Sequence, residues 1–183
     1  MSKIVAIVSS PRKNANTDFL VNTAANAAKE NGNDVEIFYL NPMANKKGCQ
    51  GCNGCKKNGT NCVMKDDLTP VLDAIRNADG VIISSPVYFG EACGQYRMLE
   101  DRFFGYLKAD FSINIAPGKK VAVITAAGSA GADALADKME GVMVNYLKFV
   151  SVGKLAVVTK NDAKFAENDA DTIAKAKALG KAF

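Results

Sequence analysis

The chain has 183 residues, 48% of them hydrophobic, and a formal net charge of +4. This length and hydrophobic fraction predict one globular domain over residues 1–183 that buries a core of its own. No apolar run approaches the length of a membrane span, and the charge is too small and too dispersed to indicate nucleic-acid binding. Because histidine is absent, histidine general bases, Ser-His and Cys-His nucleophile systems and Rieske ligation are excluded.

Short apolar runs rich in β-branched residues alternate with helical patterns along the chain. The expected strands are residues 3–8, 35–40, 80–84, 121–125 and 155–159, and the expected helices are residues 17–30, 66–77, 94–104, 132–148 and 169–179. The first helix should end at Asn31-Gly32, where glycine suits a left-handed C-cap. This alternation predicts a doubly wound α/β fold: a five-stranded parallel sheet with helices on both faces. Ligands of such sheets lie beyond the carboxyl ends of the strands.

The loop after the first strand, residues 9–17, runs directly into a helix N-terminus, whose free N–H groups and dipole favour an anion. It lacks both the Gly-Lys-[Ser/Thr] of an NTPase loop and the G-x-G-x-x-G of a dinucleotide fold. We therefore expect a terminal phosphate to bind four polar side chains of this loop, namely Ser9, Arg12, Asn16 and Thr17. The alternative is that Thr17 only caps the helix and residues 9–16 form an ordinary polar loop.

Two further loops follow the third and fourth expected strands. The first contains Pro86-Val87-Tyr88-Phe89-Gly90, which places two aromatic side chains where a planar ring can stack. The second begins at Thr125 and contains Gly128, which allows a ligand to approach the backbone closely. Each loop alone could be a simple turn, but together with the first loop they predict a mononucleotide-shaped site.

Four of the five cysteines lie in a short polar stretch, residues 45–65, which we call the cysteine segment: Cys49, Cys52, Cys55 and Cys62. This spacing suits the four ligands of one [4Fe-4S] cluster. Zinc fits less well, because it prefers two CxxC pairs separated by a longer stretch. Thiols that are merely structural are the main alternative. Disulfides are disfavoured, because the N-terminus lacks a secretory signal, which predicts a cytoplasmic chain with reduced thiols. The isolated Cys93 is expected to be a packing residue.

These motifs resemble those of the flavodoxin-like NAD(P)H-dependent FMN reductases and, within that family, of the iron–sulfur flavoproteins. Ser9-x-Pro11-Arg12-x-x-x-Asn16-Thr17 is similar to the FMN-phosphate loop. Residues 85–90, with the later Asp101-Arg102, are similar to the isoalloxazine loop and the helix after it. Residues 49–62 with Asp66-Asp67 are similar to the compact cysteine motif, whereas Glu91-Ala92-Cys93 departs from the usual pattern.

The resemblance implies a strand order of 2-1-3-4-5, non-covalently bound FMN and a [4Fe-4S] cluster near a flavin. It also implies a homodimer or homotetramer whose interface lies over the flavins, with NAD(P)H or ferredoxin as electron donor and a small molecule or a protein as acceptor. The implied FMN-binding residues are Ser9, Pro11, Arg12, Asn16, Thr17, Pro86, Val87, Tyr88, Phe89, Gly90, Thr125 and Gly128.

A protein that holds both groups could relay electrons between two-electron and one-electron partners. The flavin ring would carry the chemistry, so we predict no catalytic side chain. Two alternatives stay open. One is a cluster-free NAD(P)H-dependent reductase of free flavin, azo compounds or quinones. The other is a non-enzymatic flavin electron carrier or redox sensor.

Overall fold

The computed structural model describes residues 1–59 and 61–183, so Thr60 of the cysteine segment lies outside the described residues. Its parallel sheet has the order β2-β1-β3-β5-β6, and a short strand, β4, pairs antiparallel with β3. The strands are β1 (Lys3–Val8), β2 (Asp34–Tyr39), β3 (Gly80–Tyr88), β4 (Glu91–Ala92), β5 (Lys120–Ala127) and β6 (Val150–Val158). The five parallel strands thus follow the predicted order 2-1-3-4-5, and the predicted doubly wound α/β fold is confirmed.

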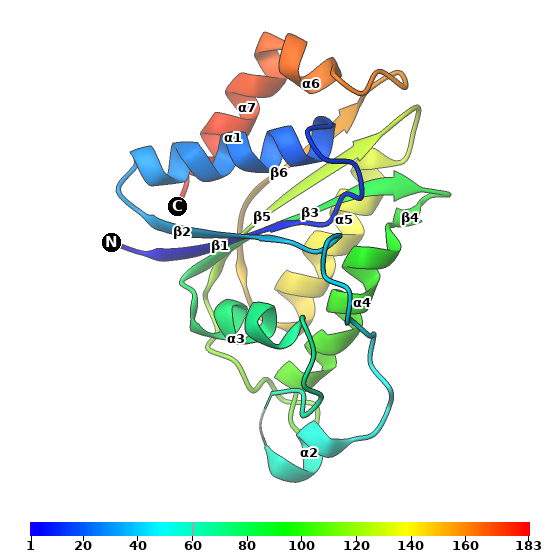
Figure 1. Ribbon diagram of the computed structural model, residues 1–183. Coiled ribbons are helices and arrows are strands. Elements are labelled where there is room, and N and C mark those ends of the chain that lie inside the picture. Colours follow the sequence, from blue (N-terminus) through cyan, green and yellow to red (C-terminus); the bar gives the residue numbers. More distant parts are fainter. Residues whose placement is uncertain (60) are drawn as a thin grey trace.

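Helices cover both faces of the sheet, as Figure 1 shows. One face carries α1 (Asn16–Glu30), α6 (Phe165–Asn168) and α7 (Ala170–Lys181), and the other carries α3 (Thr69–Asn77), α4 (Gly94–Arg102) and α5 (Ala132–Gly141). A further helix, α2 (Gly54–Asn58), lies at the bottom of the view, outside these layers. Among the described residues, no helix is both long and apolar enough to span a bilayer.

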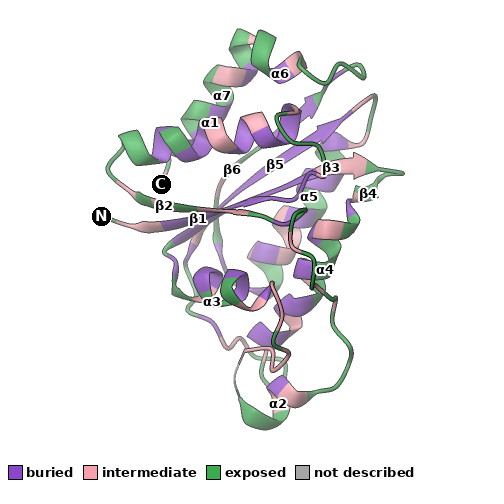
Figure 2. Ribbon diagram, in the orientation of Figure 1, coloured by how far each residue is buried: buried purple, intermediate pink, exposed green. Residues whose placement is uncertain are grey.

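Each strand supplies both halves of the core, because successive side chains point to opposite faces of the sheet. In β1, Val5 and Ile7 pack with α3, α4 and α5, whereas Ile4, Ala6 and Val8 pack with α1 and α7. The central strands β1, β3 and β5 accordingly form the buried centre of the molecule in Figure 2, whereas the edge strand β2 is largely exposed. Burial on both faces explains why the central strands read as apolar runs rather than as alternating patterns.

Some helix ends lie where the sequence predicts them and others do not. The helix α1 ends at the predicted position, and Gly32 has the positive φ of 86° expected of a C-terminal glycine. The helix α3 begins at Thr69 rather than at residue 66. The predicted helix 94–104 tightens into a 3₁₀ turn, η1 (Phe103–Tyr106), and the predicted helix 132–148 continues from α5 into a π-helical turn, η2 (Val142–Tyr146).

Candidate functional site

A cavity of about 340 Å³ opens at the edge of the sheet where the parallel strands end. The loops after β1, β5 and β6 enclose it together with the end of β3. Its lining residues are Ser10, Arg12, Ala15, Asn16, Thr17, Pro86, Val87, Tyr88, Ala126, Ala127, Gly128, Thr159, Asn161, Asp162 and Ala163. The cavity therefore brings together seven of the predicted cofactor-binding residues: Arg12, Asn16, Thr17, Pro86, Val87, Tyr88 and Gly128.

The loop after β1 delivers the start of α1 to this cavity. The helix begins at Asn16, and the residue before it, Ala15, provides no side-chain cap. Thr17 is the second helical residue and is buried, so it is not the N-cap of this helix. The first-turn N–H groups are thus left to face the cavity without a capping side chain, an arrangement that favours an anion.

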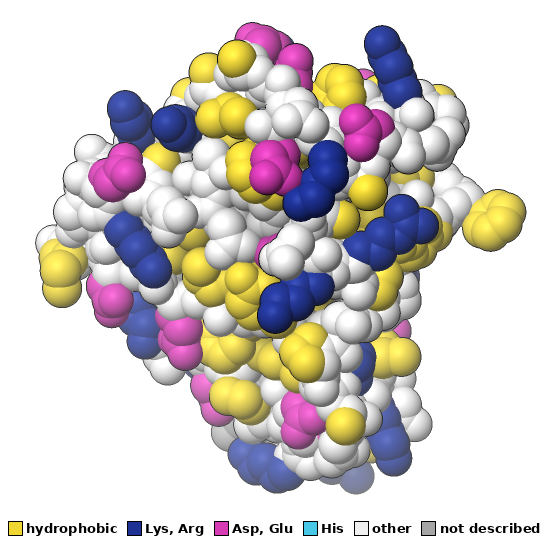
Figure 3. Space-filling model, turned by 45° about the horizontal axis from the view of Figure 1, so that its top comes forward, with side chains coloured by type: hydrophobic (Ala, Val, Ile, Leu, Met, Phe, Trp, Pro, Cys, Tyr) yellow, Lys and Arg dark blue, Asp and Glu magenta, His cyan; other side chains and the backbone are white. Residues whose placement is uncertain are grey.

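Arg12 adds a positive charge at the same loop. Its side chain is exposed, and it forms none of the salt bridges found among the described residues. In Figure 3, several Lys and Arg side chains, with acidic ones among them, lie on the right-hand part of the surface, on the side where the strands end. A free guanidinium beside uncapped helical N–H groups can bind a phosphate group bidentately.

Asn16 lines the cavity, but its side-chain amide already has two partners, one in the loop after β6 and one in α6. Its Nδ2 donates to the carbonyl oxygen of Asp162 at 2.7 Å, and its Oδ1 accepts the N–H of Ala166 at 2.8 Å. Asn16 therefore joins two walls of the cavity, and its backbone N–H is the group left for an anion.

Ser9 and Pro11 lie outside the lining of the cavity. Ser9 is fully buried, and its hydroxyl donates to the carbonyl oxygen of Ser84 at 2.5 Å, which fastens the loop after β1 to β3. Pro11 lines a separate, more apolar hollow beside Tyr39 and Pro42. Both residues therefore support the loop after β1 from outside the cavity.

The segment after Pro86 is a β-hairpin rather than an open loop. Tyr88 pairs with Glu91 across a two-residue turn, in which Phe89 and Gly90 have φ values of 51° and 81°. Two positive φ angles are typical of the type I′ turn that joins strands in tight hairpins. Tyr88 lines the cavity, whereas Phe89 stands fully exposed at the tip of the hairpin.

The hairpin is fastened to α5 by an ion pair between Glu91 and Lys138, with an N–O distance of 2.7 Å. The hydrogen bond from Lys138 is the main reason that the pKa of the Glu91 carboxyl lies below its usual value. The pair is exposed, so it orients the hairpin without adding much stability.

The end of β5 and the loop after it line the cavity with small residues. Thr125 is buried, and its hydroxyl donates to the carbonyl oxygen of Ala132 at 2.8 Å, so its side chain is directed into the fold. Gly128 does line the cavity. A Cβ atom at that position would lie 2.1 Å from Oδ1 of Asn161, so any larger residue would displace the Asn161 side chain from its place over Gly128.

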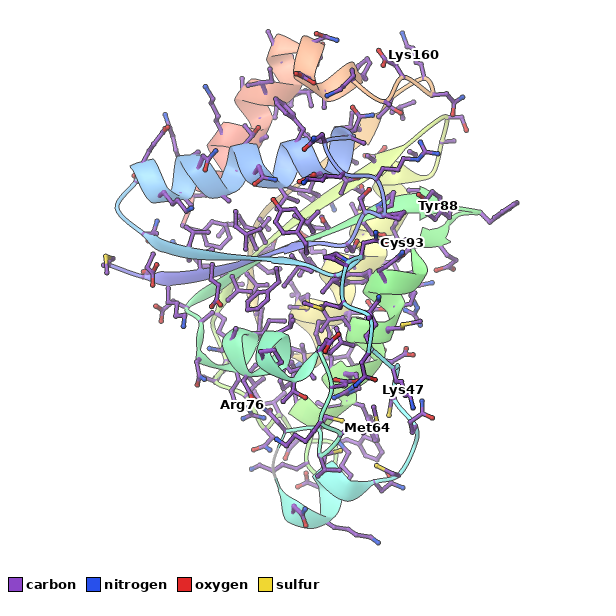
Figure 4. The ribbon with its side chains drawn as sticks, viewed as in Figure 1. Lys47, Met64, Arg76, Tyr88, Cys93 and Lys160 are labelled. Atoms are coloured by element: carbon purple, nitrogen blue, oxygen red, sulfur yellow. The ribbon has the colours of Figure 1, made fainter. Side chains whose placement is uncertain are left out.

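The loop after β6 is the part of the site that the sequence analysis missed. Asp162 N–H donates to the carbonyl oxygen of Thr159 at 2.9 Å, across a turn in which Lys160 and Asn161 have φ values of 52° and 62°. Non-glycine residues with such angles are concentrated at functional sites. In Figure 4, Tyr88 and Lys160 lie at the same end of the molecule. The missed signal was a polar Thr-Lys-Asn-Asp run directly after a predicted strand.

The cysteine segment lies at the other end of the molecule, where it carries α2 (Figure 1). Cys49 and Cys52 are exposed, Cys62 is half-buried, Cys55 is buried in α2, and all of these thiols are free. Within the described residues, no three His, Cys, Asp or Glu side chains are close enough together to hold one metal ion. The four ligands of a cubane bind four different irons, so a cluster does not require that they meet at one point.

Cys93 lies apart from the other cysteines. It is buried at the start of α4, with its Sγ 3.3 Å from both the carbonyl oxygen and the hydroxyl of Ser9. These contacts confirm its role as a packing residue.

Comparison with known proteins gives the following matches. A family model described as NADPH-dependent FMN reductase matches residues 2–164. The chain is 43% identical over 102 residues to an iron-sulfur flavoprotein of Methanocaldococcus jannaschii, a match that covers 55% of this chain and 51% of that protein. The chain thus spans about half the length of this curated relative.

Two solved structures share the fold. One is an azoreductase from Bacillus anthracis str. Sterne, with a TM-score of 0.70, 18% identity and coverage of 100% of both chains. The other is a flavodoxin from the domain Archaea, with a TM-score of 0.58, 14% identity and coverage of 99% of this chain and 94% of that one. At these identities the matches show that the fold is flavodoxin-like.

Proposed function

The chain belongs to the NADPH-dependent FMN reductase family, and we propose that it is an FMN-dependent oxidoreductase that relays electrons between FMN and a [4Fe-4S] cluster. FMN would bind without a covalent bond in the cavity at the carboxyl ends of the strands, within one domain formed by residues 1–183. The observation that carries this proposal is the uncapped start of α1 at the wall of that cavity.

The chain's own residues divide the work of holding FMN. Arg12, the hydroxyl of Thr17 and the first-turn N–H groups of α1 would bind the phosphate. The hairpin residues Pro86, Val87 and Tyr88 would border the isoalloxazine ring, and the backbone at Gly128 would approach the ligand closely. Ser9, Pro11 and Thr125 would hold these walls in place, and Phe89 and Gly90 would set the direction of the hairpin.

When bound, FMN accepts a hydride or two electrons and releases electrons singly. No side chain of the site has to act as an acid, base or nucleophile for this chemistry, so the chain's contribution is binding, orientation and exclusion of water. We propose NAD(P)H or ferredoxin as the electron donor and a small molecule or a protein as the acceptor.

The cluster is proposed for Cys49, Cys52, Cys55 and Cys62. The four free thiols of the cysteine segment form a donor set that suits iron–sulfur ligation, and the relative from M. jannaschii is named an iron-sulfur flavoprotein. The segment lies around α2, away from the strand ends (Figure 1) at which the cavity opens. We therefore propose that the relay runs between chains of a homodimer or homotetramer.

A second candidate function is a cluster-free NAD(P)H-dependent reductase of flavins or quinones. The observation in its favour is that the family model that matches residues 2–164 is described as NADPH-dependent FMN reductase. In that case the cysteine segment would serve only as a surface or interface element.

Protein purified and reconstituted without air separates the two candidates through its visible spectrum and its iron and acid-labile sulfide content. The proposal predicts flavin bands on a broad additional absorbance, with about four irons and four sulfides per chain. A reconstituted sample that binds FMN but no iron would establish the cluster-free reductase instead. Protein that turns over no small-molecule acceptor with NADPH, NADH or reduced ferredoxin would be an electron carrier rather than an oxidoreductase.

Single Ser replacements assign the ligands. Replacement of Cys49, Cys52, Cys55 or Cys62 should each lower the iron content at unchanged FMN content. Cys93→Ser is the matched control, because a serine hydroxyl can keep the contacts that the Cys93 thiol makes with Ser9. Loss of iron in this control, or its retention in the four others, would contradict the assignment.

A further inference from the structure

Arg102, the last residue of α4, is a buried cation that the FMN site does not use. It is 1% exposed and does not line the cavity. Its Nη1 lies 2.8 Å from Oδ2 of Asp66, and the carboxyl group of Asp66 is buried as well. Removing a guanidinium from water is costly unless its donors are satisfied, so its partners indicate what it is held for.

Those partners lie on both ends of the cysteine segment. Nη1 also donates to the carbonyl oxygen of Lys47 at 3.1 Å, and Nη2 donates to that of Met64 at 3.2 Å. Lys47 comes just before the first cysteine of the segment, and Met64 follows just after the last. Figure 4 shows Lys47 and Met64 near each other where the segment leaves the body of the protein. One side chain thus joins the two ends.

Asp66, the ion-pair partner of Arg102, also contacts the chain on both sides of the cysteine segment. Its Oδ2 accepts the N–H of Lys47 at 3.2 Å, and its Oδ1 accepts the N–H of Leu68 at 3.1 Å. The carboxylate therefore contacts the incoming chain, the outgoing chain and α4 at once. Nε of Arg102 is the one donor of this group that stays buried without a partner among the described residues.

The part of the cysteine segment that contains α2 makes a second contact with the body of the protein, at η1. Nζ of Lys56 in α2 donates to the carbonyl oxygens of Phe104 and Leu107. A Cβ atom on Gly105 would lie 2.8 Å from the backbone nitrogen of Cys62, so the two backbones are packed closely. The cysteine segment is therefore held to the body of the protein at two places, with α2 at η1 and the two ends at Arg102.

We propose that Arg102 and Asp66 form a clasp that closes the base of the cysteine segment and holds its four thiols within reach of one cluster. Arg102 is thus a positioning residue rather than a metal ligand. The part of this proposal that concerns the cluster rests on the proposed function. The part that concerns the order of the segment does not.

The test compares Arg102→Lys, which keeps the charge but loses the forked hydrogen bonds, with the wild type. Asp66→Asn removes the same ion pair from the other side, so the proposal is decided even if Arg102→Lys fails to fold. Arg97→Lys is the matched control, because Arg97 lies on the same helix, is itself exposed, and pairs with Glu100 and Asp101 rather than with the ends of the cysteine segment.

Hydrogen exchange is measured on the metal-free protein, and iron, sulfide and FMN affinity are measured after anaerobic reconstitution. Both clasp variants should exchange the amides of residues 45–65 at least about tenfold faster, as expected for a lost charge-assisted bond, while α1 and FMN affinity stay unchanged. Iron content should fall to less than about half, and the control should match the wild type on every measure.

Unchanged exchange in the cysteine segment would overturn the proposal, as would faster exchange spread evenly over the sheet, which would mean that Arg102 supports the whole core. If the wild type binds no iron, the cluster part of the proposed function fails. The exchange result still decides whether the clasp orders the segment.

Discussion

Asn16 offers a sharp test of the site, because its side chain holds two walls together while its position lies at the anion-binding end of α1. Two replacements separate these roles. Asn16→Ala removes both hydrogen bonds, to the carbonyl oxygen of Asp162 and from the N–H of Ala166. Asn16→Asp keeps an acceptor for Ala166 but loses the donor to Asp162 and adds a negative charge.

The expected losses of stability follow from burial. Ala166 is fully buried, so its N–H without a partner costs about 1–3 kcal/mol, whereas the carbonyl oxygen of Asp162 lies in an exposed residue and costs about 0.5–1 kcal/mol. Asn16→Ala should therefore lower the free energy of unfolding by about 1.5–4 kcal/mol. Asn16→Asp should lower it by about 0.5–1 kcal/mol, and the N-terminal helix dipole favours the new carboxylate.

FMN affinity should rank the two variants in the opposite order. A carboxylate in the first turn of α1 would repel the phosphate group. Two unit charges about 8 Å apart interact by about 2 kcal/mol at an effective dielectric constant near 20, which corresponds to roughly thirtyfold in the dissociation constant. Alanine introduces no such repulsion, so Asn16→Ala should bind FMN more tightly than Asn16→Asp.

Urea unfolding of the metal-free protein gives the first ranking, and quenching of flavin fluorescence gives the second. The predicted result is a crossed order, with the Asp variant more stable and the Ala variant the better FMN binder. If Asn16→Asp bound FMN as tightly as Asn16→Ala, the anion would not lie at the start of α1, and the reasoning would be refuted.

Three further predictions concern two other parts of the site and one residue outside it. Arg12→Ala should weaken FMN binding by about 1.5–3 kcal/mol without changing stability, because the side chain is exposed; an unchanged affinity in the same titration would count against the phosphate site. Tyr88→Ala should weaken FMN binding more than Phe89→Ala, by about 1 kcal/mol, because only Tyr88 lines the cavity; the reverse order would place the ring at the hairpin tip. Burial raises the pKa of Glu100 above 4.5, although Arg97 opposes the shift. The folded state then binds more protons than the unfolded state between pH 4.5 and the higher folded pKa, so stability falls as pH rises through this window. Glu100→Gln should consequently raise the melting temperature at neutral pH but not near pH 3, and an equal gain at both would contradict this assignment.

The fold could be predicted from the sequence because its strands are buried on both faces. Runs such as residues 4–8 and 121–124 are apolar at every position, and a parallel sheet covered by helices on both faces buries such runs. Helix boundaries were less predictable, because tertiary contacts set them. Asp66 suits the first turn of a helix, but it pairs with Arg102, and α3 begins at Thr69.

The site was predictable where it depends on strand ends and unpredictable where it depends on side-chain direction. The rule that ligands bind beyond the carboxyl ends of parallel strands correctly predicted that Arg12, Thr17, Tyr88 and Gly128 line one cavity. It could not reveal that Thr125 is directed into the fold, since direction depends on register. The hairpin was not predicted, because its first turn residue is Phe89. Phenylalanine rarely has a positive φ, whereas Asn, Asp or Gly at that position would have indicated a tight turn.

The most direct test of the central claim, that the start of α1 binds the phosphate of FMN, is a comparison of FMN with riboflavin, which has the same ring system and ribityl chain but no phosphate. Both are titrated into the metal-free protein by fluorescence quenching. With the charged group held by Arg12 and the first-turn N–H groups, FMN should bind at least about a hundredfold more tightly than riboflavin. Equal affinities for the two flavins would contradict the account.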